Sequence, residues 1–259
     1  MIIESSSNKL VKEVKSLFRK KNRDKTGLYL VEGINMVAEI LDNKLDYRAL
    51  IYSDKLREIQ GGKEVYRALS GREDVYQVTN EIFQDLSDTL TPQGVLGICR
   101  KKDYDLGDIG AGNTSYIFLD GLQDPGNMGT IIRTAEAFGL GGIILNKGSV
   151  DPYNPKVVRA TMGSIFRLPI YYVDDPKSDL ARLKERGFRV LATSLESSNS
   201  IRQVDFRKTI IVIGNESLGV SDDLYDLADQ RIKIEMLGKS ESLNAAVAAS
   251  IIMYESSKY

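Results

Sequence analysis

The stretch LDGLQDPGNMGTIIRTAEAFGLGG, residues 119–142, decides the fold of this chain. It follows an apolar run, 116–119, that predicts a strand, and it breaks at Asp124-Pro125-Gly126 before apolar residues resume at helical spacing. We expect Asn127 to be the N-cap of this helix, because its side chain can accept a hydrogen bond from a free backbone N–H. The buried stripe of the helix is expected to consist of Met128, Ile131, Ile132, Ala135 and Phe138.

Gly129 and Arg133 fall on another face of the predicted helix. Gly129 has no side chain, so it leaves space one turn before Arg133. An active-site edge of an α/β sheet typically combines a strand, a tight turn and the start of a helix, and here a guanidinium lies beside open space as well. The alternative is a buried helix start whose arginine caps a neighbouring loop, and the spacing alone leaves both interpretations open.

The composition is that of an ordinary soluble globular protein. The 259 residues are 42% hydrophobic and 27% charged, enough for one large or two modest domains. No apolar run approaches the roughly 18 residues of a membrane span, and residues 1–25 are too charged for a signal peptide. The single cysteine, Cys99, excludes an internal disulfide and lies in an apolar run typical of a core. We therefore expect a cytoplasmic protein.

The chain contains no histidine, which excludes several classes of site. Neither a Ser-His-Asp triad, nor a Cys-His pair, nor a zinc site with histidine ligands can be built. Any general base must be a carboxylate, a lysine, a tyrosine, a bound group or something more unusual. We expect no metal, because no carboxylate cluster has the spacing of a metal-binding loop.

Charge is unevenly distributed along the chain. The net charge is −1, yet residues 1–25 hold eight Lys or Arg residues against three acidic ones. This local excess is sufficient for a patch that contacts the phosphates of a nucleic acid. It is equally consistent with an amphipathic helix whose charged face is solvated, and both can hold at once. In that helix we expect the inward face to consist of Leu10, Val11, Val14, Leu17 and Phe18.

Strand and helix patterns alternate along the chain and predict two α/β domains. The first covers residues 1–105, the polar, glycine-rich segment 106–114 is the predicted linker, and the second domain covers 115–259. Strands of the second domain are almost continuous apolar runs, which favours a parallel sheet buried on both faces. Three loops that follow such strands carry unusual polar residues: 124–127 with Arg133, GNESLG at 214–219, and SESLN at 240–244. Because the carboxyl ends of parallel strands meet at one edge, we expect these loops to share a crevice.

These three loops resemble the motifs of a known family. DPGNMGTIIRTAEAFG is similar to the first motif of the SpoU (TrmH-like) branch of the SPOUT RNA methyltransferases, IGNESLGV to the second, and IKIEMLGKSESLNAAVAASIIMYE to the third. The resemblance covers 115–259. Residues 1–105 resemble more loosely the ribosomal-protein-like, substrate-binding domain often found in front of it. Two departures are Glu235, where proline is common, and Ser217-Leu218, where a glycine is usual; they bear on loop shape and cofactor affinity.

The resemblance implies a fold, a cofactor and a set of site residues. It implies a C-terminal domain with a trefoil knot, which no periodicity could predict, S-adenosylmethionine as the cofactor, and a homodimer with sites completed near its interface. No GxGxxG or P-loop motif for another nucleotide follows a strand. By the resemblance, the catalytic positions are Asn127, Arg133, Glu216, Ser242 and Asn244. The cofactor is expected to contact the backbone around Thr193, Gly214, Ile234, Met236 and Leu243.

The leading hypothesis is transfer of a methyl group from S-adenosylmethionine to a ribose 2′-hydroxyl of RNA, with ribosomal RNA favoured over tRNA. The alternatives are an RNA-binding protein that keeps the scaffold without catalysis, and a small-molecule enzyme of the flavodoxin-like type. Arg159 is expected near the site, and Arg167 at the surface or an interface. The residues predicted to bind RNA are Lys9, Lys12, Arg19, Lys20, Lys21, Arg23 and Arg159.

Overall fold

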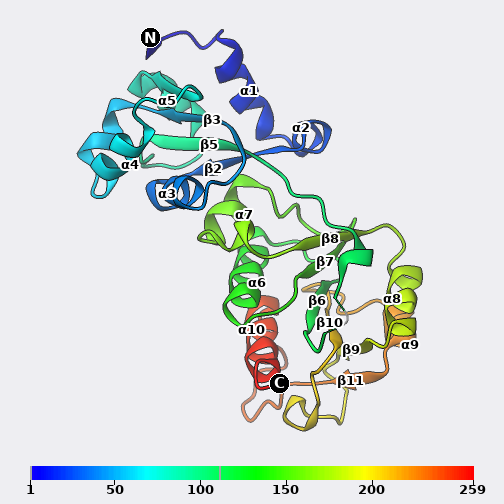
Figure 1. The fold of residues 1–259 in the computed structure, drawn as a ribbon. Coiled ribbons are helices and arrows are strands. Elements are labelled where there is room, and N and C mark those ends of the chain that lie inside the picture. The colour runs from blue at the N-terminus through cyan, green and yellow to red at the C-terminus, as the bar shows by residue number, and fades with distance from the viewer. Residues whose placement is uncertain (1, 111) are drawn as a thin grey trace. The chain divides into compact units, whose positions relative to one another are not determined.

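A computed structural model describes residues 2–110 and 112–259. Contacts divide the chain into two compact units: 1–102 together with 151–163, and 103–150 together with 164–259. Figure 1 shows the chain entering the second unit, leaving it for α7 and returning at β8. Both units are α/β, as the sequence predicts, and each is described separately below.

The first unit is built on a five-stranded sheet of order β1-β4-β3-β5-β2. Strands β1, β4 and β3 run parallel, while β5 is antiparallel to both β3 and β2. The predicted alternation of strands and helices in 26–105 is confirmed, whereas the two-residue strand β1, the helix Lys20–Thr26 and the 3₁₀ helix Asp54–Glu58 were not predicted. The strands are β1 (Ile2–Ile3), β2 (Leu28–Glu32), β3 (Tyr47–Tyr52), β4 (Val75–Val78) and β5 (Val95–Arg100).

Helices cover the sheet of the first unit. The predicted amphipathic helix is α1, and four of its five expected inward residues are buried, with Phe18 only partly so. It packs with α5 on a core of strand side chains such as Leu30, Ile51 and Ile98. The segment 151–163 adds α7, which packs against β2. The helices are α1 (Lys9–Leu17), α2 (Lys20–Thr26), α3 (Ile34–Asp42), α4 (Gly62–Leu69), α5 (Asn80–Leu86), α7 (Pro155–Ala160) and the 3₁₀ helix η1 (Asp54–Glu58).

The second unit is built on a six-stranded sheet of order β11-β9-β10-β6-β7-β8, in which every pairing is parallel. Its central strands are buried along their length, which confirms the sheet predicted from continuous apolar runs. The strands are β6 (Tyr116–Leu119), β7 (Ile143–Asn146), β8 (Ile170–Val173), β9 (Arg189–Thr193), β10 (Thr209–Ile213) and β11 (Gln230–Ile232).

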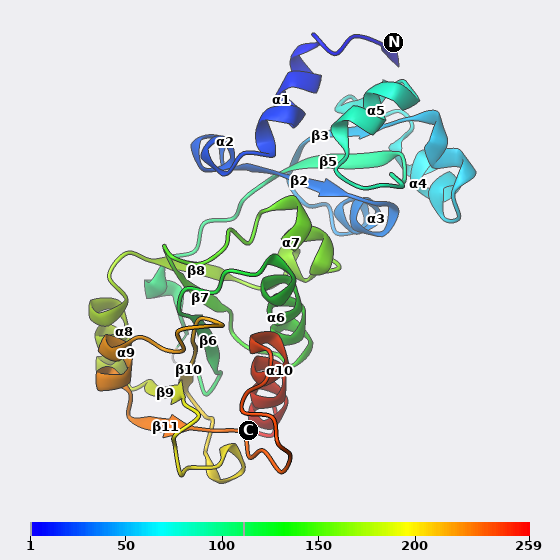
Figure 2. The ribbon, with the colours of Figure 1, turned by 180° about the vertical axis from the view of Figure 1, so that it is seen from behind.

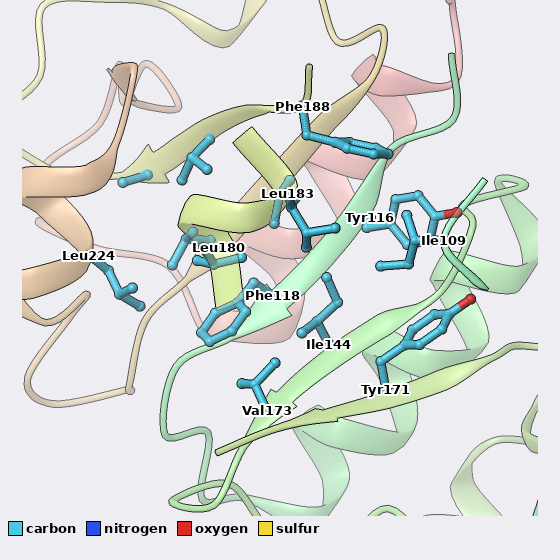
Figure 3. Close-up of a cluster of buried hydrophobic side chains, with 14 of the residues drawn as sticks. Ile109, Tyr116, Phe118, Ile144, Tyr171, Val173, Leu180, Leu183, Phe188 and Leu224 are labelled. Atoms are coloured by element: carbon cyan, nitrogen blue, oxygen red, sulfur yellow. The ribbon is translucent and has the colours of Figure 1, made fainter. Parts of the chain in front are cut away.

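Two helix pairs flank this sheet, and Figures 1 and 2 show α6 beside α10 and α8 beside α9. Alternate strand residues face the two pairs. Phe118 and Ile144 meet Leu180 and Leu183 of α8 and Leu224 of α9 in one buried cluster (Figure 3). The helices are α6 (Pro125–Ala137), α8 (Pro176–Glu185), α9 (Asp222–Leu227), α10 (Ala245–Ser256) and the 3₁₀ helices η2 (Leu106–Asp108), η3 (Ser164–Phe166) and η4 (Ile201–Gln203).

The segment predicted to link the domains, 106–114, is packed against the second unit. Ile109 is buried in the same cluster as Tyr116, and Tyr104 and Leu106 pack against that cluster. Arg186, the C-cap residue that follows α8, donates a hydrogen bond to the Leu106 carbonyl over 2.9 Å. Ala111, in the middle of this segment, lies outside the described residues. The polar composition of segment 106–114 predicted a linker. Tyr104, Leu106 and Ile109 instead pack this part of the chain onto the apolar cluster of the second unit.

Candidate active site

The order of the second sheet brings the polar loops together. Strand β6 lies beside β10, and the chain leads outward from β6 to β7 and β8 before it returns on the other side. The loops that follow β6 and β10 are therefore neighbours at the point where strand order reverses, which is where open α/β sheets bind ligands. The loop after β11 leads to α10, which packs against α6.

The helix cap at the start of α6 differs from the sequence expectation. Asp124 is the N-cap, Pro125 is the first helical residue, and Asn127 lies inside the first turn. The Asp124 carboxylate accepts a hydrogen bond of 2.7 Å from the Asn127 backbone N–H. The prediction of Asn127 as N-cap was wrong because an aspartate followed by proline fits the start of a helix better. The side-chain amide of Asn127 is therefore not used in capping the helix and can make other contacts.

The Asn127 side chain links all three predicted loops. Its Nδ2 donates to Glu216 Oε1 over 3.0 Å, and its Oδ1 accepts from Asn244 Nδ2 over 2.9 Å. Asn127 is buried, whereas Glu216 and Asn244 lie at the surface. Asn244 also caps α10, because its Oδ1 accepts from the backbone N–H groups of Ala246 and Val247. Side chains separated by 89 and 117 positions in the sequence thus form one hydrogen-bonded chain.

Glu216 is held as an ion by its surroundings. Its two oxygens accept hydrogen bonds of 3.2 Å from the backbone N–H groups of Gln123 and Asp124, in addition to the one from Asn127. Burial by itself would raise the pKa of this carboxyl, but these hydrogen bonds outweigh burial and lower its pKa below the ordinary value. Glu216 is therefore negatively charged at neutral pH.

Three further polar residues at the strand ends were not in the predicted site. Asp120 accepts from Asn146 Nδ2 and from the Ser221 backbone N–H, both over 2.8 Å. Asn215 donates to the Gly121 carbonyl over 2.8 Å and accepts from two backbone N–H groups of its own loop. Asp120 directly follows β6 and Asn146 ends β7, so the rule that selected the three loops could have selected these two as well, whereas Asn215 lies inside the selected loop 214–219.

Arg133 and Ser242 lie apart from this hydrogen-bonded chain. Arg133 is exposed on α6, and its guanidinium forms no hydrogen bond or ion pair with any described residue. Asn127 and Arg133 are six positions apart, so at 3.6 residues per turn they point about 120° away from each other. Ser242 is exposed in the loop before α10. The structure therefore brings together Asn127, Glu216 and Asn244, and leaves Arg133 and Ser242 open to solvent.

The predicted cofactor positions lie in loops and strand ends of the same unit. Thr193 ends β9, and its carbonyl accepts from the Tyr225 hydroxyl over 2.9 Å. Gly214 is enclosed, since a Cβ there would lie 2.1 Å from the Gly219 carbonyl carbon. The other three positions, Ile234, Met236 and Leu243, belong to the segment 234–243, which forms no backbone-to-backbone hydrogen bond with any described residue. Its N–H and C=O groups are thus open to a ligand, as a cofactor cradle requires.

The residues predicted to bind RNA differ in exposure. Lys9, Lys12, Arg19, Lys20 and Lys21 are exposed on α1 and α2 or between them. Arg23, by contrast, is only 2% exposed. Its guanidinium donates to Asp151 Oδ2 over 2.6 and 2.8 Å and to the carbonyls of Leu17 and Phe18. Four of its five N–H groups are thus engaged and the side chain is buried, so Arg23 cannot reach a phosphate, and its inclusion among the RNA-binding residues is corrected.

Two further arginines were assigned from the sequence. Arg159, expected near the site, is part of the first unit, where it pairs with Asp88 and, over 3.5 Å, with Glu32. Its charge is thus compensated by two carboxylates. Arg167, expected at the surface, is partly exposed and pairs with Glu136 over 2.7 Å.

Comparison with known proteins decides the family. The sequence pattern of the SpoU rRNA Methylase family matches residues 114–254. The chain belongs to this family. Residues 8–97 match the MRM3-like substrate binding domain. The chain is 32% identical over 256 residues to the 23S rRNA (guanosine(2553)-2′-O)-methyltransferase RlmP of Bacillus subtilis, an alignment that covers 97% of each protein.

Solved structures agree with this assignment. The AdoMet-bound rRNA methyltransferase from Sinorhizobium meliloti has a TM-score of 0.87 and 32% identity, covering 100% of this chain and 97% of that one. The SpoU methyltransferase AviRb from Streptomyces viridochromogenes, in complex with AdoMet, has a TM-score of 0.84 and 27% identity over 97% of this chain and 98% of that one. The predicted family and the two-domain fold class are confirmed.

The described residues form neither a metal-binding cluster nor a membrane-spanning helix. Residues 2–110 and 112–259 contain no group of three or more Cys, Asp or Glu side chains placed to hold a metal ion. No helix in the same ranges is long and apolar enough to span a bilayer.

Proposed function

We propose that this chain transfers a methyl group from S-adenosylmethionine to a ribose 2′-hydroxyl of ribosomal RNA. The observation that carries the proposal is the hydrogen-bonded chain of Asn127, Glu216 and Asn244, which joins the three loops of the family motifs. A purely RNA-binding scaffold has no need to hold these polar groups together. The Bacillus subtilis relative is named for this reaction on 23S rRNA, which favours ribosomal RNA over tRNA.

We place the cofactor against the loops that follow β9, β10 and β11. Backbone groups of 234–243 form no backbone-to-backbone hydrogen bond with any described residue. Gly214 has no side chain, which allows the two ends of the 214–219 loop to approach each other closely. Bound S-adenosylmethionine supplies an electrophilic methyl on a sulfonium whose leaving group is a neutral thioether, so the reaction needs no Lewis acid. Thr193, Gly214, Ile234, Met236 and Leu243 would surround it chiefly with backbone groups.

Gly214→Ala tests the placement of the cofactor. Because the added Cβ would lie 2.1 to 2.4 Å from backbone atoms of Gly219 and Val220, the loop must move. Calorimetric titration with S-adenosylmethionine should then give an affinity at least about tenfold weaker than that of the wild-type chain, corresponding to about 1.4 kcal/mol. Gly139→Ala, also at a loop glycine but outside the cradle, is the control. Equal affinities for Gly214→Ala and wild type would move the cofactor site elsewhere.

The chemical step needs the ribose hydroxyl to lose its proton as the methyl arrives. We assign stabilisation of the reacting hydroxyl to Arg133, and by the family resemblance we keep Asn127, Glu216, Ser242 and Asn244 as the remaining site residues. A guanidinium is normally charged in proteins, so Arg133 is not suited to take this proton itself. We therefore favour an electrostatic role, in which Arg133 stabilises the developing alkoxide and anchors the phosphate, while the proton of the ribose hydroxyl passes to solvent water, to which Arg133 is open.

We assign RNA binding mainly to the first unit. Support comes from the exposed basic side chains of α1 and α2 and from the match of residues 8–97 to a substrate-binding domain. Arg23 is left out of this surface because it is buried. We propose domain limits of 1–105 and 115–259, with segment 151–163 working as part of the first unit. A trefoil knot in the second domain and a cytoplasmic location complete the proposal.

We also propose a homodimer formed through α10. Val247, Ile251 and Tyr254 follow one another at helical spacing and are 47%, 38% and 59% exposed, which is an unusual apolar stripe for a helix open to water. Ile251→Glu should convert the dimer to a monomer in analytical ultracentrifugation. The control is Tyr172→Glu on β8, whose side chain is 53% exposed. A wild-type chain that sediments as a monomer would refute the dimer.

A further inference from the structure

A second cluster of polar and aromatic side chains lies in the first unit, where strands β3 and β4 end. Tyr52, the last residue of β3, is paired in register with Gln77 of the parallel strand β4. Side chains from η1 and α4 join them at this edge. Carboxyl ends of parallel strands are where open α/β sheets place ligands, and the proposed methyl transfer uses none of these residues.

The side chains of this cluster form a closed ring of contacts. The Tyr52 hydroxyl donates to Gln77 Oε1 over 3.4 Å, and Gln77 Nε2 donates to Asp54 Oδ1 over 3.1 Å. Asp54 pairs with Arg57 Nη2 over 3.3 Å, and the same nitrogen donates to the Tyr66 hydroxyl over 2.9 Å. The rings of Tyr66 and Tyr52 close the circle edge to face, with centroids 5.5 Å apart. Each group is therefore held in place by two neighbours.

This ring of contacts holds the Arg57 guanidinium over the Tyr66 ring. Arg57 Cζ lies 4.1 Å from the centroid of the Tyr66 ring, while the Arg57 side chain remains 45% exposed. The backing is rigid, because a Cβ on Gly62 would lie 1.7 Å from the Leu56 carbonyl oxygen, so η1 and the start of α4 pack backbone against backbone. Planar guanidinium and aromatic groups are the surfaces on which proteins stack unpaired RNA bases.

We propose that Arg57 and Tyr66 form a stacking platform for an unpaired base of the RNA substrate. The inference rests on the proposed function, since it takes RNA as the ligand. The platform is preorganised, so little side-chain freedom is lost when a base binds. Lys63 and Arg67 are exposed on α4, the helix that carries Tyr66, and supply positive charge for the flanking phosphates.

The test uses the full chain and a single-stranded oligoadenylate that carries one 2-aminopurine, whose fluorescence falls when the base is stacked. Arg57→Ala and Tyr66→Leu should each weaken binding about tenfold and reduce the quenching, as loss of one stacking contact does. Tyr66→Phe keeps the ring and should keep most of the affinity. The matched control is Arg100→Ala, which removes an arginine of the same unit that is 52% exposed and also paired with an aspartate, Asp46, over 3.2 Å.

Equal loss of affinity in Arg57→Ala and Arg100→Ala would show a general charge effect and overturn the platform, as would no loss in either variant. Methylation of ribosomal RNA by the wild-type chain is measured on the same preparation. If methyl transfer occurs and Arg57→Ala still binds the oligonucleotide normally, only the platform is refuted. If no methyl is transferred while binding and quenching depend on Arg57, the platform stands and the proposed function falls.

Discussion

Arg133 is exposed on α6, and no described side chain satisfies its guanidinium. This is unusual for a residue with a purely structural role, because a capping arginine would contact the carbonyls of a neighbouring loop. The sequence left that alternative open, and the structure shows no such cap within residues 2–110 and 112–259. An exposed, unpaired guanidinium is instead suited to a group that arrives from solution, such as an RNA phosphate.

Substitution of Arg133 distinguishes its possible roles. Arg133→Ala should lower single-turnover methylation by about 10² or more, as the removal of a preorganised donor does. Arg133→Lys keeps the charge but loses the planar fork, so it should retain measurable turnover if the role is electrostatic. The measurement uses saturating RNA and cofactor, with Arg202→Ala, an exposed arginine of the same unit, as the control. Near-normal turnover in Arg133→Ala would remove this residue from the mechanism.

At the scale of elements, α7 joins the first unit through a buried ion pair. Arg23 of α2 and Asp151 are 2% and 5% exposed at their side chains, and the Asp151 carboxylate also accepts from the Tyr153 backbone N–H over 2.9 Å. The ring of Tyr153 lies 4.8 Å from that of Tyr29 on β2. These contacts explain why a segment inside the methylase half of the sequence packs with the N-terminal residues.

Breaking this pair should destabilise the protein strongly. Arg23→Met leaves the Asp151 carboxylate buried without a positively charged partner, so we expect the free energy of unfolding to fall by about 3–5 kcal/mol. Urea denaturation measures the change. Lys20→Met is the matched control, because it breaks the exposed pair with Asp24 on the same helix and should cost at most about 0.5 kcal/mol. Similar losses in the two variants would contradict the structural role of Arg23.

Sequence patterns predicted the elements well and their partners less well. Hydrophobic spacing located β2 through β10 and the helices between them, because each pattern depends on neighbours within a few positions. The partnership of Arg23 and Asp151 spans 128 positions, so nothing local distinguishes Arg23 from the exposed lysines beside it. The wrong cap at Asn127 has a local cause instead, because Asp124 followed by Pro125 starts a helix better than Asn127 does. The Asn127 amide is used by Glu216, 89 positions away, and only the family resemblance pointed to that residue.

At the scale of the whole molecule, the net charge of −1 conceals a local basic surface. Lys9, Lys12, Arg19 and Lys21 are exposed, and none of them is part of an ion pair within the described residues. Binding of ribosomal RNA should therefore weaken as salt rises, through counterion release. Filter binding from about 50 to 200 mM salt should give a steep slope for the wild-type chain. Lys12→Ala combined with Lys21→Ala should reduce that slope, and an unchanged slope would place the RNA elsewhere.

The central claim is that the chain methylates a ribose 2′-hydroxyl of ribosomal RNA. The most direct measurement incubates the purified chain and S-adenosylmethionine with ribosomal RNA from cells that lack the gene, and then maps methylated nucleosides by mass spectrometry. We expect one new 2′-O-methylated nucleoside. The Asn127→Ala variant should still bind RNA but should not produce this nucleoside. Methylation on a base, methylation of tRNA alone, or no methyl transfer by a chain that binds both ligands would contradict it.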